Sequence, residues 1–255
     1  MLSRARVLIA AGLAATIGSA AFGQGLAMND DERQWFLSGY IFASGITGDV
    51  STVGPLPDAS IDLKFSDLIQ DLEGGVMAMV EYRSGPWSLI GDLMHSYTRP
   101  SGNLPGSLID DVELKQRQTT LQGNVLYRAY ATPDMRVDVG GGLRYWNLNN
   151  QITVTSPVAP TVTGTQEKDW IDPVVAVRFQ TRINDKWRAT FFADYGGFGA
   201  GSDETWQIVG TFDYSLNEKL LLRAGYRVLS TDYRDGNFRY DVRMHGPLIG
   251  LTYRF

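Results

Sequence analysis

The 255-residue chain contains no cysteine and only two histidines. Without cysteine, the chain can form no disulfide bond, thiolate metal site or cysteine nucleophile. An excess of positive charge is also missing, because 23 lysines and arginines are set against 28 aspartates and glutamates. Proteins that bind nucleic acids usually carry net positive charge, so we expect no nucleic-acid partner.

Long hydrophobic runs are missing beyond the N-terminus. Arg4 and Arg6 precede an apolar run at 7–17 and a cluster of small residues at 18–23. This pattern is typical of a secretory signal peptide, and the run is shorter than the roughly 20 residues of a spanning helix. We therefore expect a signal peptide at 1–23, an N-terminal lead-in at 24–34 and one domain at 35–255. A membrane protein without a long apolar segment would have to be a β-barrel.

Alternation of apolar with polar or small residues recurs through the chain and predicts strands with one apolar face. The closing strand is an example, because Ile249, Leu251 and Tyr253 alternate with Gly250, Thr252 and Arg254. The ten predicted strands are Trp35–Ile46, Val76–Arg83, Trp87–Ser96, Glu113–Ala131, Met135–Thr155, Pro173–Ile183, Trp187–Tyr195, Trp206–Ser215, Leu220–Thr231 and Tyr240–Phe255.

Four short turns alternate with five mostly longer loops between these strands. This arrangement predicts an all-β, antiparallel, up-and-down transmembrane barrel, with ten strands or, if one hairpin is an extended loop, eight. Aromatic residues near strand ends predict the two interfacial girdles of such a barrel. The apolar faces would then contact the lipid bilayer, and the closing strand would pair with the first strand as well as with Leu220–Thr231.

Charged residues lie on the opposite, inward faces of the predicted strands. Each buried charge needs a partner, so we expect these side chains to fill the lumen with ion pairs. The predicted lumen charges are Glu81, Asp92, Arg128, Asp138, Arg144, Arg178, Asp194, Asp213, Arg223 and Arg227.

The connecting segments carry weaker signals. Helical spacing of apolar residues predicts a short amphipathic helix at Phe65–Glu73, and a loop rich in Pro and Thr is expected to end near Trp170. The last loop, Asp232–Arg239, contains Asp232, Asp235 and Asn237, which could meet a cation, although solvated loop side chains are commoner. The glycine-rich stretch 196–201 lacks the lysine of a phosphate-binding loop and indicates a tight turn.

The C-terminal Tyr253-Arg254-Phe255 resembles the aromatic signature of Gram-negative outer-membrane β-barrels, including the OmpA-like and OmpW-like types. The segments F-S-D-L-I-Q-D-L-E, W-I-D-P-V-V-A-V-R-F and Y-G-G-F-G-A-G-S-D-E-T-W-Q are also similar to a family of outer-membrane barrels of unassigned activity, as is the stretch from Gly236 to Phe255. The resemblance implies location in the outer membrane of a Gram-negative bacterium. It also implies that Tyr253 and Phe255 are read by the barrel-assembly machinery. It implies little about activity, and any extracellular partner stays unknown.

Enzymatic barrels make a poor match. Omptin proteases need an Asp pair and an Asp-x-His pair, whereas His245 follows Arg243-Met244 and Asp110 directly precedes Asp111. Lipid A deacylases carry His-x-Ser, whereas His95 and Ser96 are adjacent and would face opposite sides of a strand.

We therefore expect a non-enzymatic protein without cofactor or metal, with a structural or surface-interaction role and a lumen plugged by ion pairs. The alternative is a narrow channel for small solutes or ions, with an anion preference set by its arginines. An omptin-like protease or lipid-modifying enzyme is the third interpretation.

Overall fold

The computed structural model describes residues 33–50, 59–63, 72–99, 101–102, 111–155 and 161–255, and all strand pairs among them are antiparallel. No helix in these residues is long and apolar enough to cross a membrane. The strands are β1 (Gln34–Phe42), β2 (Gly45–Val50), β3 (Ala59–Leu63), β4 (Leu72–Ser84), β5 (Trp87–Thr98), β6 (Ser101–Gly102), β7 (Asp111–Ala131), β8 (Met135–Thr155), β9 (Val162–Arg182), β10 (Trp187–Gly197), β11 (Glu204–Ser215), β12 (Leu220–Asp235) and β13 (Phe238–Arg254).

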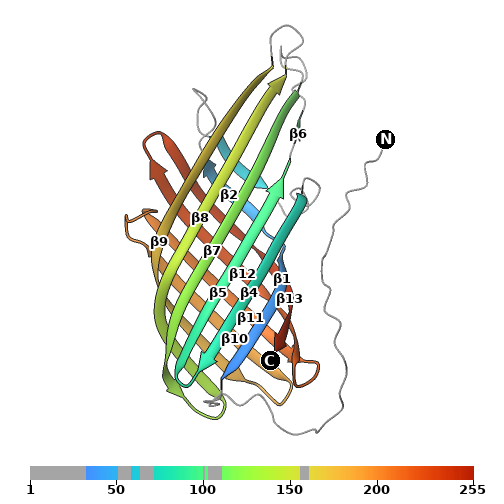
Figure 1. Cartoon of the computed structure of the whole chain (residues 1–255), viewed down its shortest axis with the longest axis vertical. Helices are drawn as coiled ribbons and strands as arrows, with labels where there is room; N and C mark the ends of the chain where they lie inside the picture. The colour runs from blue at the N-terminus through green and yellow to red at the C-terminus, as the bar shows by residue number, and fades with distance from the viewer. Residues whose placement is uncertain (1–32, 51–58, 64–71, 100, 103–110, 156–160) are drawn as a thin grey trace, which may run out of the picture.

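Ten of these strands form a closed barrel wall (Figure 1). Strand β13 closes it by pairing with β12 on one side and with β1 on the other, where Leu37 lies opposite Tyr253. Strand β2 extends the pairing of β1 along β13, while β3 and β6 are short additions to β2 and β7. The prediction of ten strands is confirmed, as is closure between the first and last strands, and the eight-stranded alternative is wrong.

The alternation of side chains sorts the wall into an apolar outside and a polar inside. Large apolar side chains on the outer face are about half exposed, including Trp35, Val76, Leu143, Val175 and Phe212, at 50–57%. Burying such side chains in water-free surroundings stabilises a protein by roughly 1.5–3 kcal/mol each, so this face requires lipid or another apolar medium. The predicted outward register of the strands is confirmed.

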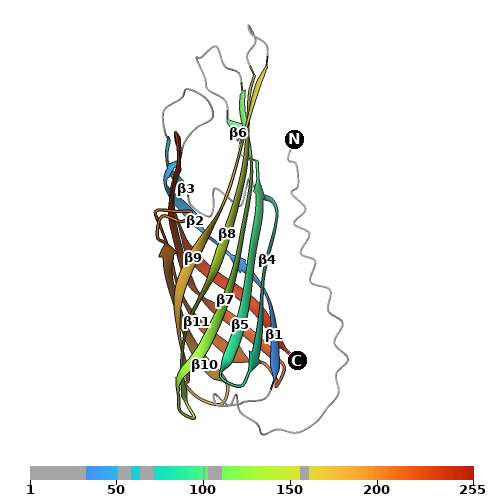
Figure 2. The same cartoon turned by 60° about the vertical axis from the view of Figure 1, so that its left-hand side comes forward.

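Strands β7, β8 and β9 rise above the rest of the wall at the loop end (Figures 1 and 2). Each has 21 residues, about twice the length that spans a bilayer at a tilt. We call their upper part, residues 111–119 of β7, 147–155 of β8 and 162–169 of β9, the raised sheet. The neighbouring wall is lower, because β10 already ends at Gly197 and β11 begins only at Glu204.

Several loop predictions need correction. The loop expected to end near Trp170 is wrong, because β9 already begins at Val162 and pairs with β8. The last loop is also mostly strand, since β12 continues to Asp235 and β13 begins at Phe238. These stretches are rich in Thr and other polar residues, because strands that extend beyond the membrane no longer need an apolar face. Without that face, the alternation that predicts a strand is missing. The predicted helix falls mainly on 64–71, outside the described residues, while its last two residues begin β4.

Glycines in the middle of β8 permit a close approach of neighbouring backbones. A Cβ on Gly142 would overlap the carbonyl oxygen of Gly123 on β7, and a Cβ on Gly140 would overlap that of Val125. The close backbone approach expected from this glycine run is therefore present.

Candidate functional site in the barrel interior

The structure places all ten predicted lumen charges on the inner face of the wall. Most of them are buried almost completely, and Asp138, Arg144 and Asp213 have no exposed surface. They separate into layers stacked along the barrel axis, described below from the short-turn end to the loop end.

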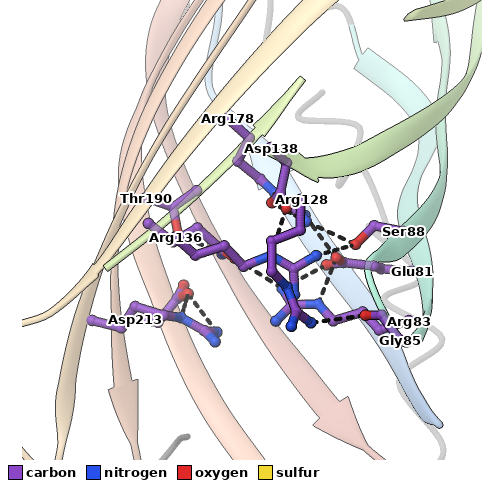
Figure 3. A network of polar contacts seen from close by, with 12 residues as sticks. Glu81, Arg83, Gly85, Ser88, Arg128, Arg136, Asp138, Arg178, Thr190 and Asp213 are labelled. Carbon is purple, nitrogen blue, oxygen red and sulfur yellow. Dashed lines mark hydrogen bonds and ion pairs between the residues drawn. The ribbon is translucent and has the colours of Figure 1, made fainter. Parts of the chain in front are cut away.

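The lowest layer is an ionic cluster around Arg178 (Figure 3). From β9, the Arg178 guanidinium donates to Glu81 on β4 at 2.6 Å and to Asp138 on β8 at 2.9 Å. Glu81 also accepts from Arg83 at 2.7 Å, and Asp138 accepts from Arg136 at 2.6 Å. Because β4 and β9 are not neighbours in the wall, the Arg178–Glu81 pair crosses the lumen.

A second ionic group lies against the opposite wall. Asp213 on β11 accepts hydrogen bonds from Arg188 at 3.0 Å and from Arg223 at 2.6 Å. Near the β4–β5 turn, Arg128 donates to the carbonyl oxygen of Gly85 at 2.7 Å. Together with the cluster around Arg178, these contacts lie at the short-turn end of the lumen.

The middle layer contains two more ion pairs between strands that are not neighbours in the wall. Arg144 on β8 donates to Asp194 on β10 at 2.6 Å, and Gln122 on β7 reaches the same carboxylate at 2.8 Å. Arg227 on β12 donates to Asp92 on β5 at 2.9 Å, so this pair also crosses the lumen. The hydroxyl of Tyr40 joins the pair by donating to Asp92 at 2.5 Å.

A cavity of about 110 Å³ lies between these layers. It is lined by Arg178, Arg223 and Arg227 together with Glu81 and Asp92, among others. Two buried polar atoms of its lining, Oε1 of Gln207 and Nε of Arg227, lack a hydrogen-bond partner among the described residues. A polar cavity of this volume has room for several water molecules.

The upper layer is apolar and was not predicted. Trp146, Trp170 and Tyr233 form a continuous stack with ring centroids 5.7 and 3.9 Å apart, and Tyr240 meets both indoles edge-on. The hydroxyl of Tyr240 on β13 donates to Gln118 on β7 at 3.1 Å, a further contact across the lumen. Buried apolar side chains complete this aromatic layer: Phe42, Met94, Leu148, Leu229, Phe238, Val242, Met244 and Leu248.

A buried carboxylate fastens the glycine-rich turn to this layer. Asp172 on β9 accepts hydrogen bonds from the backbone N–H of Ser202 at 2.6 Å and from the indole of Trp170 at 3.0 Å. The turn itself is tight, with left-handed φ angles at Gly197, Phe198 and Gly199. The expected tight connection is thus confirmed.

Neither histidine lies in the lumen layers. Nδ1 of His95 is 2.9 Å from the hydroxyl of Thr119, and that of His245 is 3.0 Å from the hydroxyl of Tyr226, all on the outer face. Among the described residues, no group of three or more His, Asp and Glu side chains could hold a metal ion.

The weak cation site of the last connection is not assembled. Asp232 pairs with Arg234 at 3.1 Å, and Asp235 accepts from Lys168 at 2.6 Å across the mouth of the barrel. The latter hydrogen bond raises the pKa of the Lys168 ammonium. The carboxylates therefore meet the protein's own cations.

The missed residues follow the same inward parity as the predicted ones. Trp146 continues the inward series of β8 after Arg144, and Asp172 and Trp170 continue that of β9 from Arg178 toward the loop end. Their inward placement could have been read from the alternation. At this height the inward residues of the sequence change from charged to aromatic, and this change predicts an apolar layer above the ionic ones.

Comparisons with known proteins agree on the fold. The outer membrane protease OmpT from Escherichia coli matches with a TM-score of 0.55 and 9% identity over 88% of this chain and 97% of that one. The attachment invasion locus protein Ail of Yersinia pestis matches with a TM-score of 0.37 and 12% identity over 88% of this chain and 98% of that one. No protein-family model and no curated protein sequence matches.

These identities show the fold alone, and a TM-score of 0.37 is too low to carry an argument. The closed wall of ten strands, its apolar exterior and the OmpT match together define the fold of an outer-membrane β-barrel. Proteins with this architecture have varied roles, so activity must be argued from the interior and the extracellular face.

Proposed function

We propose that the protein is a non-conducting outer-membrane barrel whose function is structural or surface-interacting and resides on its extracellular face. The observation that carries the proposal is the set of side-chain bridges between distant strands at successive heights. Arg178–Glu81, Arg227–Asp92 and Tyr240–Gln118 connect β9 with β4, β12 with β5 and β13 with β7. A barrel of about eight strands is just filled by its own side chains, and ten strands leave little additional room.

The raised sheet is the part best placed to meet a partner. It extends beyond the level at which β10 and β11 end, on the side of the long loops, which faces the outside in bacterial barrels. Its outer face carries uncharged polar side chains such as Asn149 and Thr163 beside charged ones such as Arg117 and Glu167. A surface of this kind is suited to hydrogen-bonded contact with another macromolecule.

The same proposal assigns the protein no catalytic activity. The third interpretation, an omptin-like protease or lipid-modifying enzyme, requires a histidine that works with a carboxylate or a serine. His95 and His245 instead contact Thr119 and Tyr226, which supports a non-enzymatic role. The likeness to OmpT concerns the fold only.

A shortened barrel tests the surface role. Replacing 149–167 by Asn-Gly would join Leu148 to Lys168, which already face each other, through a two-residue hairpin turn. We expect cells that display the shortened barrel to lose adhesion to immobilised extracellular-matrix protein or glycans that cells with the intact barrel show. Retained heat modifiability on a denaturing gel provides the folding control. Equal adhesion by both forms would contradict a role for the raised sheet.

A narrow anion channel is the second candidate, because one observation favours it. The cavity of about 110 Å³ is lined by three arginines and only two carboxylates, Glu81 and Asp92. Such a lining would attract small anions if the layers above and below it opened. Bilayer recording separates the two candidates.

A further inference from the structure

The outer wall over β9–β12 contains a groove of about 430 Å³ in the membrane-facing surface. Its walls are the rings of Phe179, Phe191, Phe212 and Tyr226, and its floor includes Gly210. A Cβ on Gly210 would meet no atom within 4 Å, so the glycine leaves open space among four rings. The volume lies within the range of small-molecule sites, about 300–1,000 Å³.

The groove faces the hydrocarbon of the bilayer, since the half-exposed Phe191, Phe212 and Tyr226 belong to the apolar exterior. The molecules that surround this surface in the membrane carry acyl chains. An acyl chain is also the right shape for an apolar channel between aromatic rings, because it can bend to follow the open floor. The wall above the groove indicates which kind of chain-bearing molecule would bind.

A cation lies on the same wall, toward the loop end. Cross-strand pairing sets Gly210 beside Tyr226, which lies beside Pro247. Four residues closer to the loop end, the same pairing sets Trp206 beside Ser230, which lies beside Arg243. The four residues from Pro247 to Arg243 span about 13 Å along β13, at about 3.3 Å per residue. Arg243 therefore lies where the wall leaves the hydrocarbon toward the outside.

The guanidinium of Arg243 is exposed and lies 5.3 Å from the centroid of the Trp206 ring. It forms no ion pair within the described part of the chain, in contrast to Arg239, which lies four positions earlier on the same outer face and pairs with Asp241. Arginine held over an aromatic ring keeps its donors directed outward, and its planar fork matches phosphate as well as carboxylate. Between Arg243 and the groove lies the hydrogen-bonded pair Tyr226–His245, which can meet ester or hydroxyl oxygens.

We propose that the β9–β13 wall holds one phosphate-bearing lipid, with its phosphate on Arg243 and an acyl chain in the groove at Gly210. The apolar groove and the cation lie one above the other at a spacing that a single lipid can span. The inference goes beyond the proposed function, because it concerns the membrane-facing wall and neither the lumen nor the raised sheet.

Two variants remove the two halves of the site separately. Gly210→Leu fills the groove, and Arg243→Gln removes the cation. The chain offers matched controls: Gly123 is another outward glycine whose Cβ would meet no atom within 4 Å, and Arg117 is another exposed arginine over an aromatic ring, Tyr97. Gly123→Leu and Arg117→Gln therefore repeat each chemical change away from the site.

The measurement is native mass spectrometry of the purified barrel in mild detergent, titrated with phosphatidylglycerol. We expect Gly210→Leu and Arg243→Gln each to lower the affinity for the tightest-bound lipid by about tenfold, the equivalent of one charge-assisted contact. Both control variants should bind the lipid as the wild type does. Unchanged binding in both site variants overturns the proposal. Weaker lipid binding in only one of the two variants contradicts a single lipid that spans both halves. Displacement of the bound lipid by inorganic phosphate alone would show that Arg243 binds the free ion.

Discussion

Replacing Arg178 by alanine should destabilise the barrel strongly, because this side chain connects two walls of the lumen. Its guanidinium is 3% exposed and contacts Glu81 at 2.6 Å, Asp138 at 2.8 Å and Ser88 at 3.0 Å. Breaking a buried ion pair by removing one partner costs about 3–5 kcal/mol, because a buried charge is left without its counter-charge. Arg83 and Arg136 remain beside the two carboxylates, so we expect the lower end, about 3 kcal/mol.

Arg182→Ala provides a matched control on the same strand. Arg182 pairs with Asp134 at 2.6 Å, as short a contact as that of Arg178 with Glu81, but the two side chains are 28% and 61% exposed. Exposed ion pairs contribute about 0–1 kcal/mol. The assay is reversible urea unfolding of the barrel in lipid vesicles, followed by tryptophan fluorescence. A loss below about 1 kcal/mol for Arg178→Ala, or equal losses for the two variants, would refute the account of the ionic layer.

Two further predictions concern the upper layer and the backbone contacts. Trp170→Ala should remove the central ring of the aromatic stack and lower the free energy of unfolding by about 3–5 kcal/mol in the same assay; a change within about 0.5 kcal/mol would show that the stack contributes little. Gly142→Ala should prevent barrel formation, because the added Cβ would overlap the carbonyl oxygen of Gly123, whereas Gly123→Ala should be tolerated. Heat modifiability of both variants on a denaturing gel checks this, and a fully folded Gly142→Ala barrel would be the contrary result.

The alternation of side chains was sufficient to predict the wall of the barrel. Leu37 and Tyr253, apolar residues of the first and last predicted strands, lie opposite each other on the outer face where β1 closes on β13. Strand parity has only two states, and an apolar face toward lipid makes the choice between them clear in every spanning strand. The same parity placed Arg178 and Asp213 inside the lumen.

The partners inside the lumen could not be predicted, because they depend on how distant strands face each other across the barrel. Arg178 and Glu81 are 97 residues apart in sequence, and nothing local links them. The aromatic layer was missed for a different reason. Trp146 and Trp170 follow the inward parity of β8 and β9, but at their height the inward side chains change from charged to aromatic, and only the charged ones were predicted to fill the lumen.

Missing alternation between apolar and polar residues explains why the sequence predicts a loop at the start of β9. Val162 to Asp169 alternates Thr, Gln, Glu and Lys without an apolar face, although the backbone pairs with β8 throughout. The raised sheet is therefore held by backbone pairing, and its length became visible only in three dimensions. This is also the part on which the proposed surface role depends.

Planar-bilayer recording of the refolded wild-type barrel tests the central claim most directly, with a reconstituted general porin in the same membrane as the positive control. We propose that the bridges Arg178–Glu81, Arg227–Asp92 and Tyr240–Gln118 close the lumen at successive heights, and we therefore expect insertion without conductance steps. Uniform single-channel steps from the wild-type protein, and especially steps that favour anions over cations, would contradict it and establish the arginine-lined interior as a pore.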